Sequence, residues 1–272
     1  MLCYKYMSYE RFIQSIKPTG VFLKVSRPIE FNDPYDCTGI ATGDVPQHLR
    51  YSYRKVFHQF LSPVEFDLSV KVNTRRKFDR MYRIMSLCDS SVNGTAGEML
   101  MWAHYADNSR GVRIGIEIDT DRYRLGAVEY KECLPQLDMT KIKEWKIYDD
   151  PELKRFLRAC LLTKHKIWSY EQERRVVFRV NDPSLKPFSV VDAAGPIYDA
   201  TMIWNPDKDV IKEVCLGSEF LRGKSYDKVD VYFKALFEAG YDFKIYDAIK
   251  RRQYGYGLTE HMIDKKRKID KV

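Results

Sequence analysis

The sequence lacks the features that mark secreted, membrane-spanning and zinc-binding proteins. Its apolar runs, such as Val21 to Val25, are interrupted within a few positions, whereas a transmembrane helix needs about 20 apolar residues. Residues 1–12 contain no apolar stretch of the kind found in a secretory signal, so we expect a cytoplasmic protein with no membrane contact. The six cysteines form no CxxC pair and no Cys/His cluster at zinc spacing, so we expect buried thiols.

Common nucleotide-binding and hydrolase motifs are also missing. Gly255 and Gly257 lead into neither a GK[ST] phosphate loop nor a GxGxxG turn, and no HExxH or GxSxG occurs. These absences exclude P-loop, Rossmann, zincin and α/β-hydrolase sites as they are usually built.

The composition is that of a folded, basic protein. The 272 residues are 44% hydrophobic and 14% aromatic, which is ample for a packed core. Lys and Arg number 46 against 38 Asp and Glu, which gives a net charge of +8. This balance favours an acidic or polyanionic partner, and RNA or DNA is a candidate.

Apolar periodicity predicts an α+β domain over residues 1–260 and a basic tail over 261–272. Helices are expected after Ser8 and Asp150, which can cap them, and near residues 97–107 and 227–239. A helical insertion is expected over about 46–85, with Arg75, Arg76, Lys77, Arg80 and Arg83 facing away from its apolar side. Strands are expected over the following ranges: 4–6, 21–25, 112–118, 174–180, 210–216 and 243–246.

Four segments carry side chains that plain core packing does not require. In Phe31 to Asp36, Asn32 and Asp33 suit either a structural turn or contacts with ligand hydroxyls. In Met101 to Tyr105, core packing explains Met101 and Trp102 but not His104 and Tyr105. In Tyr4-Lys5-Tyr6, the lysine suits an edge strand or a site.

The fourth segment, Trp168 to Arg175, is the most informative. In an extended chain Glu171 and Glu173 point to the same face, where two carboxylates repel each other and one pKa rises. Such a pair suits acid–base chemistry. The alternative is that Arg174 and Arg175 simply neutralise both carboxylates.

Together the four segments resemble a family of bacterial and phage proteins of unknown function. Its members read YKY, FNDPFD, MWxHYxxxxxG and WxYExExR, which correspond here to residues 4–6, 31–36, 101–111 and 168–174. The resemblance extends from Tyr4 to Leu258 and implies no activity by itself.

A more distant resemblance is to the ADP-ribosyltransferase fold, in which two small packed sheets with flanking helices clamp NAD. It rests on an early strand with a polar residue, a helix, a strand ending in Ser26 and the late ExE element. The resemblance implies that Glu173 holds the nicotinamide ribose and stabilises an oxocarbenium-like transition state, while Glu171 orients or deprotonates the acceptor. The implied cofactor-binding residues are Tyr4, Lys5, Tyr6, Ser26, Asn32, Asp33, His104 and Tyr105. Where the transferases usually carry Arg or His on the first strand, this chain has Lys5.

We therefore expect an NAD-dependent ADP-ribosyltransferase that needs no metal and modifies a macromolecule, with nucleic acid as one candidate. The expected setting is that of a toxin or a defence system, with an antitoxin as a candidate partner. Glu173→Gln is expected to abolish activity without affecting folding. One alternative is a nuclease that holds a divalent ion with Asp33, Asp36, Glu171 and Glu173. Another is a non-catalytic nucleic-acid-binding module that uses the arginines of the insertion and the C-terminal lysines.

Overall fold

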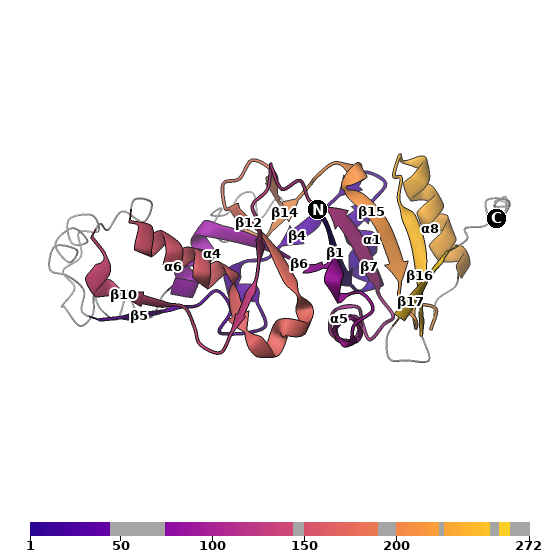
Figure 1. Ribbon diagram of the computed structural model, residues 1–272. Coiled ribbons are helices and arrows are strands. Elements are labelled where there is room, and N and C mark those ends of the chain that lie inside the picture. Colours follow the sequence, from indigo (N-terminus) through magenta and orange to yellow (C-terminus); the bar gives the residue numbers. More distant parts are fainter. Residues whose placement is uncertain (44–73, 144–149, 190–199, 223–225, 251–255, 262–272) are drawn as a thin grey trace.

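The computed structural model describes residues 1–43, 74–143, 150–189, 200–222, 226–250 and 256–261 (Figure 1). Helices and strands are mixed along the chain around one eight-stranded sheet, which corrects the expectation of two small packed sheets. In spatial order its strands are β17 (Tyr256–Glu260), β16 (Lys244–Lys250), β15 (Ile211–Leu216), β7 (Val112–Glu117), β1 (Leu2–Met7), β6 (Tyr82–Asp89), β12 (Glu173–Arg179) and β8 (Leu125–Ala127).

The large sheet opens between β1 and β6. These strands pair only through Cys3 with Asp89 and Tyr4 with Cys88, whereas β1 pairs with β7 along its whole length. Further along β6, Ile84 pairs with Ser26 and not with β1. The main chains of Ser26 and Ile84 exchange hydrogen bonds of 2.8 and 2.9 Å. The sheet therefore has an opening where parts of β1 and β6 face each other without pairing with each other.

Short sheets and 3-10 turns surround the large sheet. Strand β14 (Met202–Trp204) lies between β13 (Leu185–Pro187) and β4 (Leu23–Val25) in an antiparallel sheet. The two-stranded sheets are β2 (Ile16–Lys17) with β3 (Gly20–Val21), β5 (Ile40–Thr42) with β10 (Gln136–Asp138), and β9 (Glu129–Lys131) with β11 (Thr163–His165). The 3-10 turns are η1 (Pro28–Glu30), η2 (Ser90–Val92), η3 (Met139–Lys141), η4 (Lys166–Glu171) and η5 (Lys208–Val210).

Helix boundaries follow the local signals in the sequence. Ser8 caps α1 (Tyr9–Ser15) by accepting from the Arg11 amide, as predicted. Asp150 caps α6 (Pro151–Leu162) by accepting from two amides of its first turn. Gly240, with φ of +90°, follows α8 (Tyr226–Glu238), where a left-handed residue ends the helix. Helix α5 (Ala96–Tyr105) matches the helix expected over 97–107.

Three apolar clusters fix the sheet in place. The largest packs α1 and α8 against one face of the sheet, where the rings of Phe12 and Phe233 lie 5.9 Å apart. A second packs α5 on the opposite face, with Trp102 edge-on to Tyr6 at 5.1 Å. The third packs α6 near β12 through residues such as Phe156 and Cys160. Figure 1 shows α8 alongside β15–β17 and α5 below β1 and β7.

The predicted helical insertion is wrong at its C-terminal end. Helix α4 (Thr74–Met81) ends at Met81, and Tyr82–Asp89 forms β6. Tyr82 and Met85 are spaced like residues of a helix, but pairing with both β1 and β12 makes this segment a central strand. Arg83, expected to face away, is fully buried and donates to the Asp79 carbonyl at 2.7 Å. Residues 44–73, the side chains of residues 74–77 and the tail at 262–272 lie outside the description.

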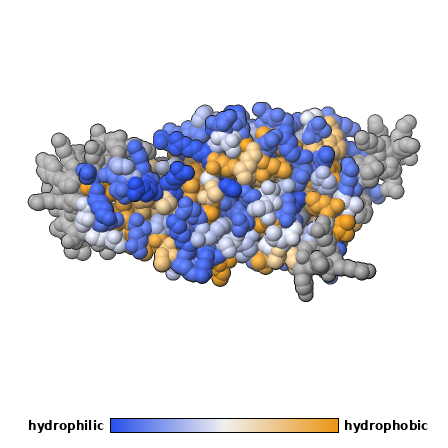
Figure 2. All heavy atoms as spheres, in the orientation of Figure 1, coloured by the Kyte–Doolittle hydropathy of each residue, from blue (hydrophilic) through white to orange (hydrophobic). Residues whose placement is uncertain are grey.

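The surface and the cysteines agree largely with the composition. Hydrophilic residues cover most of the face shown in Figure 2, and hydrophobic residues gather near its middle. No helix in the described ranges is long and apolar enough to cross a bilayer. Five cysteines are buried as expected, but Cys133 is exposed.

Truncating a core aromatic on α8 tests this packing. Phe233→Ala is expected to lower the free energy of unfolding by about 3–5 kcal/mol, because Phe233 is fully buried against Phe12 and Phe243. Val231→Ala on the same helix, where the side chain is exposed, should change it by less than about 0.5 kcal/mol. Urea denaturation of both variants provides the comparison, and equal losses would contradict the assigned core face.

Candidate functional site

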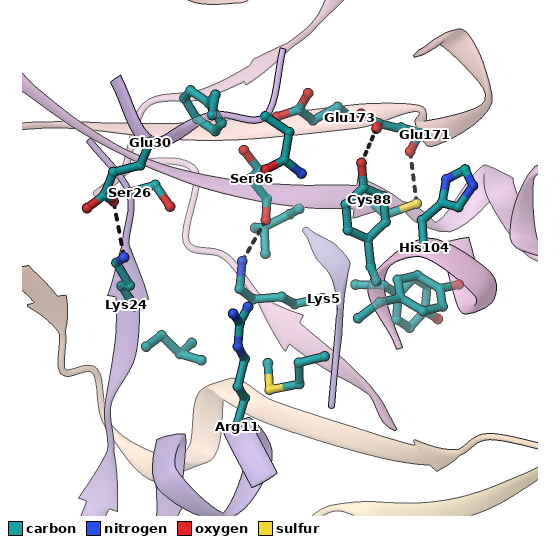
Figure 3. A pocket seen from close by; sticks show the side chains of 18 of the residues that line it. Lys5, Arg11, Lys24, Ser26, Glu30, Ser86, Cys88, His104, Glu171 and Glu173 are labelled. Carbon is teal, nitrogen blue, oxygen red and sulfur yellow. Dashed lines mark hydrogen bonds and ion pairs between the residues drawn. The ribbon is translucent and has the colours of Figure 1, made fainter. Parts of the chain in front are cut away.

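A cavity of about 780 Å³ lies at the opening in the sheet (Figure 3). The structure brings together in its wall all ten residues that the sequence singled out: Tyr4, Lys5, Tyr6, Ser26, Asn32, Asp33, His104, Tyr105, Glu171 and Glu173. Their catalytic and binding roles remain predictions. The lining also includes Arg11, Lys24, Asp36, Ser86, Lys164 and Trp168.

Strand β1 presents Lys5 to the opening. Its Nζ donates to the Ser86 carbonyl at 3.0 Å, across the gap where β1 and β6 no longer pair (Figure 3). Burial and the neighbouring Arg11 lower the pKa of Lys5 to about 8, and the negative charge of Glu173 opposes them. Tyr4 and Tyr6 alternate with Lys5 along the strand, and their rings contact Arg113 and Trp102. They therefore form part of the wall while packing mainly toward α5.

Glu171 is held at both carboxylate oxygens. Tyr105 donates to Oε1 at 2.6 Å and Lys164 donates to Oε2 at 2.7 Å. Burial raises the pKa of Glu171, and the positive charge of Lys164 only partly offsets this effect. Glu171 is the last residue of η4, and Gln172 after it has a left-handed backbone conformation with φ of +44°. The two glutamates thus converge through this turn and not through the extended chain that was expected.

Glu173 belongs to a buried ion cluster. Arg175 is fully buried and donates from Nε to Glu173 Oε1 at 2.8 Å and from Nη2 to Oε2 at 3.0 Å. The same Nη2 donates to Asp36 Oδ1 at 2.7 Å. Burial alone would raise the pKa of Glu173, but Arg175 and then Lys164 lower it to about 2. Burial raises the pKa of Asp36 despite the same guanidinium.

Lys164 is one of the site residues that sequence reasoning missed, together with Arg11 and Lys24. Besides Glu171, its Nζ lies 3.5 Å from Glu173 Oε2 and 3.8 Å from Asp36 Oδ2. The three carboxylates raise the pKa of Lys164 although burial opposes them, so the lysine stays charged. In the sequence it is only the first of three basic residues at the end of the predicted helix, Lys164, His165 and Lys166. In the structure α6 stops at Leu162, and β11 turns the Lys164 side chain into the cluster.

The turn at 31–36 closes one side of the cavity. Asp33 accepts from the Tyr35 amide at 2.8 Å, the turn bond expected of this residue, and from Trp168 Nε1 at 3.0 Å. Asn32 lines the cavity with an exposed side chain. The turn is therefore structural and also part of the cavity wall.

Two residues of helix α5 bind the η4 turn, which ends at Glu171. His104 Nδ1 lies 2.9 Å from the Tyr170 hydroxyl. The next residue of the helix, Tyr105, donates a hydrogen bond to the carboxylate of Glu171, which follows Tyr170. Two consecutive residues of α5 thus hold two consecutive residues of η4. These hydrogen bonds give His104 and Tyr105 a role in holding η4, whereas core packing did not account for their presence.

The structure also bears on the alternatives. Arg175 does pair with Glu173, but Arg174 points elsewhere and donates to Asp89 at 2.8 Å. Across the described ranges, no three His, Cys, Asp or Glu side chains are grouped so as to hold a metal ion. The carboxylates proposed as metal ligands in a nuclease are instead bound to Lys164, Arg175 and, for Asp33, to Trp168.

Comparison with known proteins adds one finding. Residues 101–176 match the family model described as a protein of unknown function (DUF2971). The DUF2971 match begins at Met101 within α5 and ends within β12, so it contains Tyr105, Lys164, Glu171, Glu173 and Arg175. The motifs at 4–6 and 31–36 lie outside it. No curated protein and no solved structure matches the chain.

Glu173 is buried and not at the surface, which argues against the expectation that Glu173→Gln leaves folding intact. With only about 5% of Glu173 exposed, the substitution removes one charge from a buried cluster. We expect it to lower the free energy of unfolding by about 3 kcal/mol, at the low end for breaking a buried ion pair because Asp36 still binds Arg175. Glu117→Gln, at an exposed position on β7, is the control and should change stability by less than about 0.5 kcal/mol.

Acid denaturation should show the same interaction. The pKa of Glu173 is about 2 in the folded protein against an ordinary 4.5, so its contribution is present above pH 4.5 and lost as the pH falls toward 2. The Glu173→Gln variant should therefore lose less stability than wild type between these pH values. Urea denaturation at a series of pH values measures the free energy of unfolding of both proteins. The same decrease in both between pH 4.5 and 2 would show that Glu173 is not held ionised by the cluster.

Proposed function

We propose that the cavity binds NAD and that the protein cleaves its N-glycosidic bond, transferring ADP-ribose to a macromolecule. The observation that carries the proposal is the pairing of two unlike carboxylates at one end of the cavity. Glu173 is kept ionised by Arg175 and Lys164, whereas burial raises the pKa of Glu171. Pairs of carboxylates whose environments separate their pKa values are a common basis for dividing electrostatic and acid–base roles.

The two carboxylates suit different parts of this reaction. Cleavage of the glycosidic bond leaves positive charge on the ribose, and a permanently ionised Glu173 would stabilise that charge. Glu171, whose pKa is raised by burial, is the better proton acceptor for an attacking hydroxyl or amine. This division agrees with the roles implied by the ADP-ribosyltransferase resemblance.

The basic part of the cavity suits the pyrophosphate. Figure 3 shows Arg11 extending toward Lys5, and the two like charges act on each other. Lys24 also lines the cavity, although it is paired with Glu30 at 3.1 Å. Cations that face one another are stabilised by an anion between them. A volume of about 780 Å³ is within the usual range for cavities that hold molecules of this size.

Exposed apolar side chains near the cavity support a macromolecular acceptor. The most exposed large apolar residues of the described chain are Tyr35, Ile167 and Phe188, which are 63%, 69% and 67% exposed. Phe188 lines the cavity, and the other two lie next to the lining residues of the 31–36 turn and Trp168. We infer that these side chains offer apolar surface to an acceptor that reaches the cavity. With the net charge of +8, nucleic acid is a candidate acceptor.

Release of nicotinamide tests the proposed function. Purified wild-type protein is expected to release nicotinamide from NAD, alone or with RNA, DNA or cell lysate as acceptor. Glu171→Gln should reduce turnover by about 10²–10⁴-fold, the usual contribution of a proton-transferring group. Glu173→Gln should reduce it by at least about 10²-fold, as expected for loss of charge stabilisation.

Folding is checked by circular dichroism under the assay conditions, and Glu117→Gln is the control for loss of an exposed carboxylate. Absence of nicotinamide release by folded wild-type protein with every acceptor would contradict the proposal. Full turnover by folded Glu171→Gln and Glu173→Gln would contradict the assigned residues.

The pH dependence of NAD binding tests the role of Lys5. Because its pKa is about 8, Lys5 loses its positive charge as the pH rises through 8, and the dissociation constant for NAD should increase about tenfold between pH 7 and 10. Lys5→Arg keeps its charge over this range, so its dissociation constant should stay nearly constant. Calorimetric titration measures both, and the same pH dependence in the two proteins would exclude Lys5 as the group responsible.

A further inference from the structure

Lys164 occupies the centre of the carboxylate cluster. Its Nζ lies 2.7 Å from Glu171 and 3.5 Å from Glu173, so one ammonium group contacts both glutamates of the ExE element. It also lies 3.8 Å from Asp36. An ammonium group has three N–H donors, which matches this number of neighbouring carboxylates.

The position of Lys164 is fixed from two sides. Its Nζ lies 4.8 Å from the centre of the Trp168 ring, a cation–π contact with the residue that also binds Asp33. Its main chain lies in β11, where it pairs with Tyr130 of β9. The hydroxyl of Tyr130 in turn accepts from the Glu173 amide at 2.7 Å. The lysine and Glu173 are thus held by the same pair of short strands.

We propose that Lys164 is a positioning residue that holds the carboxylates of Glu171 and Glu173 toward a common point and keeps Glu171 negatively charged in the resting enzyme. This inference rests on the proposed function, since it assigns a role within that site. Lys164 does not need to touch the substrate, because it acts through the two glutamates.

Among the groups around Glu171, Lys164 is the one that supplies positive charge by direct contact in the part of the chain that the structure describes. Tyr105 donates a hydrogen bond to it, and the side chains of Tyr170, Tyr130 and Cys88 are neutral near pH 7. Glu173 contributes a negative charge, which opposes ionisation of Glu171. Arg175 binds Glu173 and Asp36 but makes no direct contact with Glu171 within the ion-pair distances of the described residues. Lys164 is therefore the cation in contact with Glu171.

Lys164→Met removes the charge while keeping a side chain of similar length. We expect kcat for nicotinamide release to fall about 10- to 100-fold at neutral pH with little change in KM. The acid limb of the pH profile should move upward by about 1–3 on the pH scale, the usual effect of one opposite charge at this distance. Lys164→Arg, which keeps the charge, should retain the wild-type pH profile, and Lys166→Met, at the exposed neighbouring lysine, is the matched control.

A second measurement separates this inference from the proposed function. Carbon-13 NMR of the glutamate carboxyl groups, with the Glu171 signal assigned by its loss in Glu171→Gln, reports ionisation of Glu171 without requiring activity. An upward move of that titration in Lys164→Met, absent in Lys164→Arg, supports the role of Lys164 even if NAD is not the substrate. An unchanged titration and an unchanged pH profile in folded Lys164→Met would overturn it.

Discussion

The site depends on the burial of one guanidinium group. Arg175 is fully buried, and its donors reach Glu173, Asp36 and the carbonyl of Leu161, which belong to β12, the 31–36 turn and the end of α6. A buried arginine cannot lose its charge, so its neighbours must supply negative charge and hydrogen-bond acceptors. Three segments are thereby joined at one point, one of them 139 residues away from Arg175 in the sequence, and Glu173 is ionised as a consequence.

The second constraint is the early end of pairing between β1 and β6. Had these strands paired along their whole length, the sheet would have been continuous and Lys5 would have had no cavity to enter. Instead Ile84 of β6 pairs with Ser26, and Lys5 donates a hydrogen bond to the Ser86 carbonyl across the opening. The cavity therefore contains the carboxylates bound by Arg175 and Lys164 and, at the opening, the cations Lys5 and Arg11. We propose that these charges suit a dinucleotide with a cationic ring and an anionic pyrophosphate.

Much of this arrangement could be predicted from local sequence signals. The caps at Ser8 and Asp150 and the glycine after α8 gave correct helices, and residues that did not suit a plain core proved to line one cavity. Three features could not be predicted, because each depends on tertiary contacts. The segment after Met81 satisfies a helical period yet pairs as a central strand, Lys164 resembles an ordinary basic helix end, and the sequence does not reveal which arginine meets Glu173.

The central claim is that the carboxylates and the cations of the cavity together bind one NAD molecule. A crystal structure of Glu171→Gln, grown with NAD, tests it most directly. The account predicts electron density for the nicotinamide ribose within hydrogen-bond distance of Glu173 and for the pyrophosphate between Lys5 and Arg11. NAD bound outside the opening would contradict the claim. Crystals of the folded protein grown with millimolar NAD that show no bound NAD would contradict it as well.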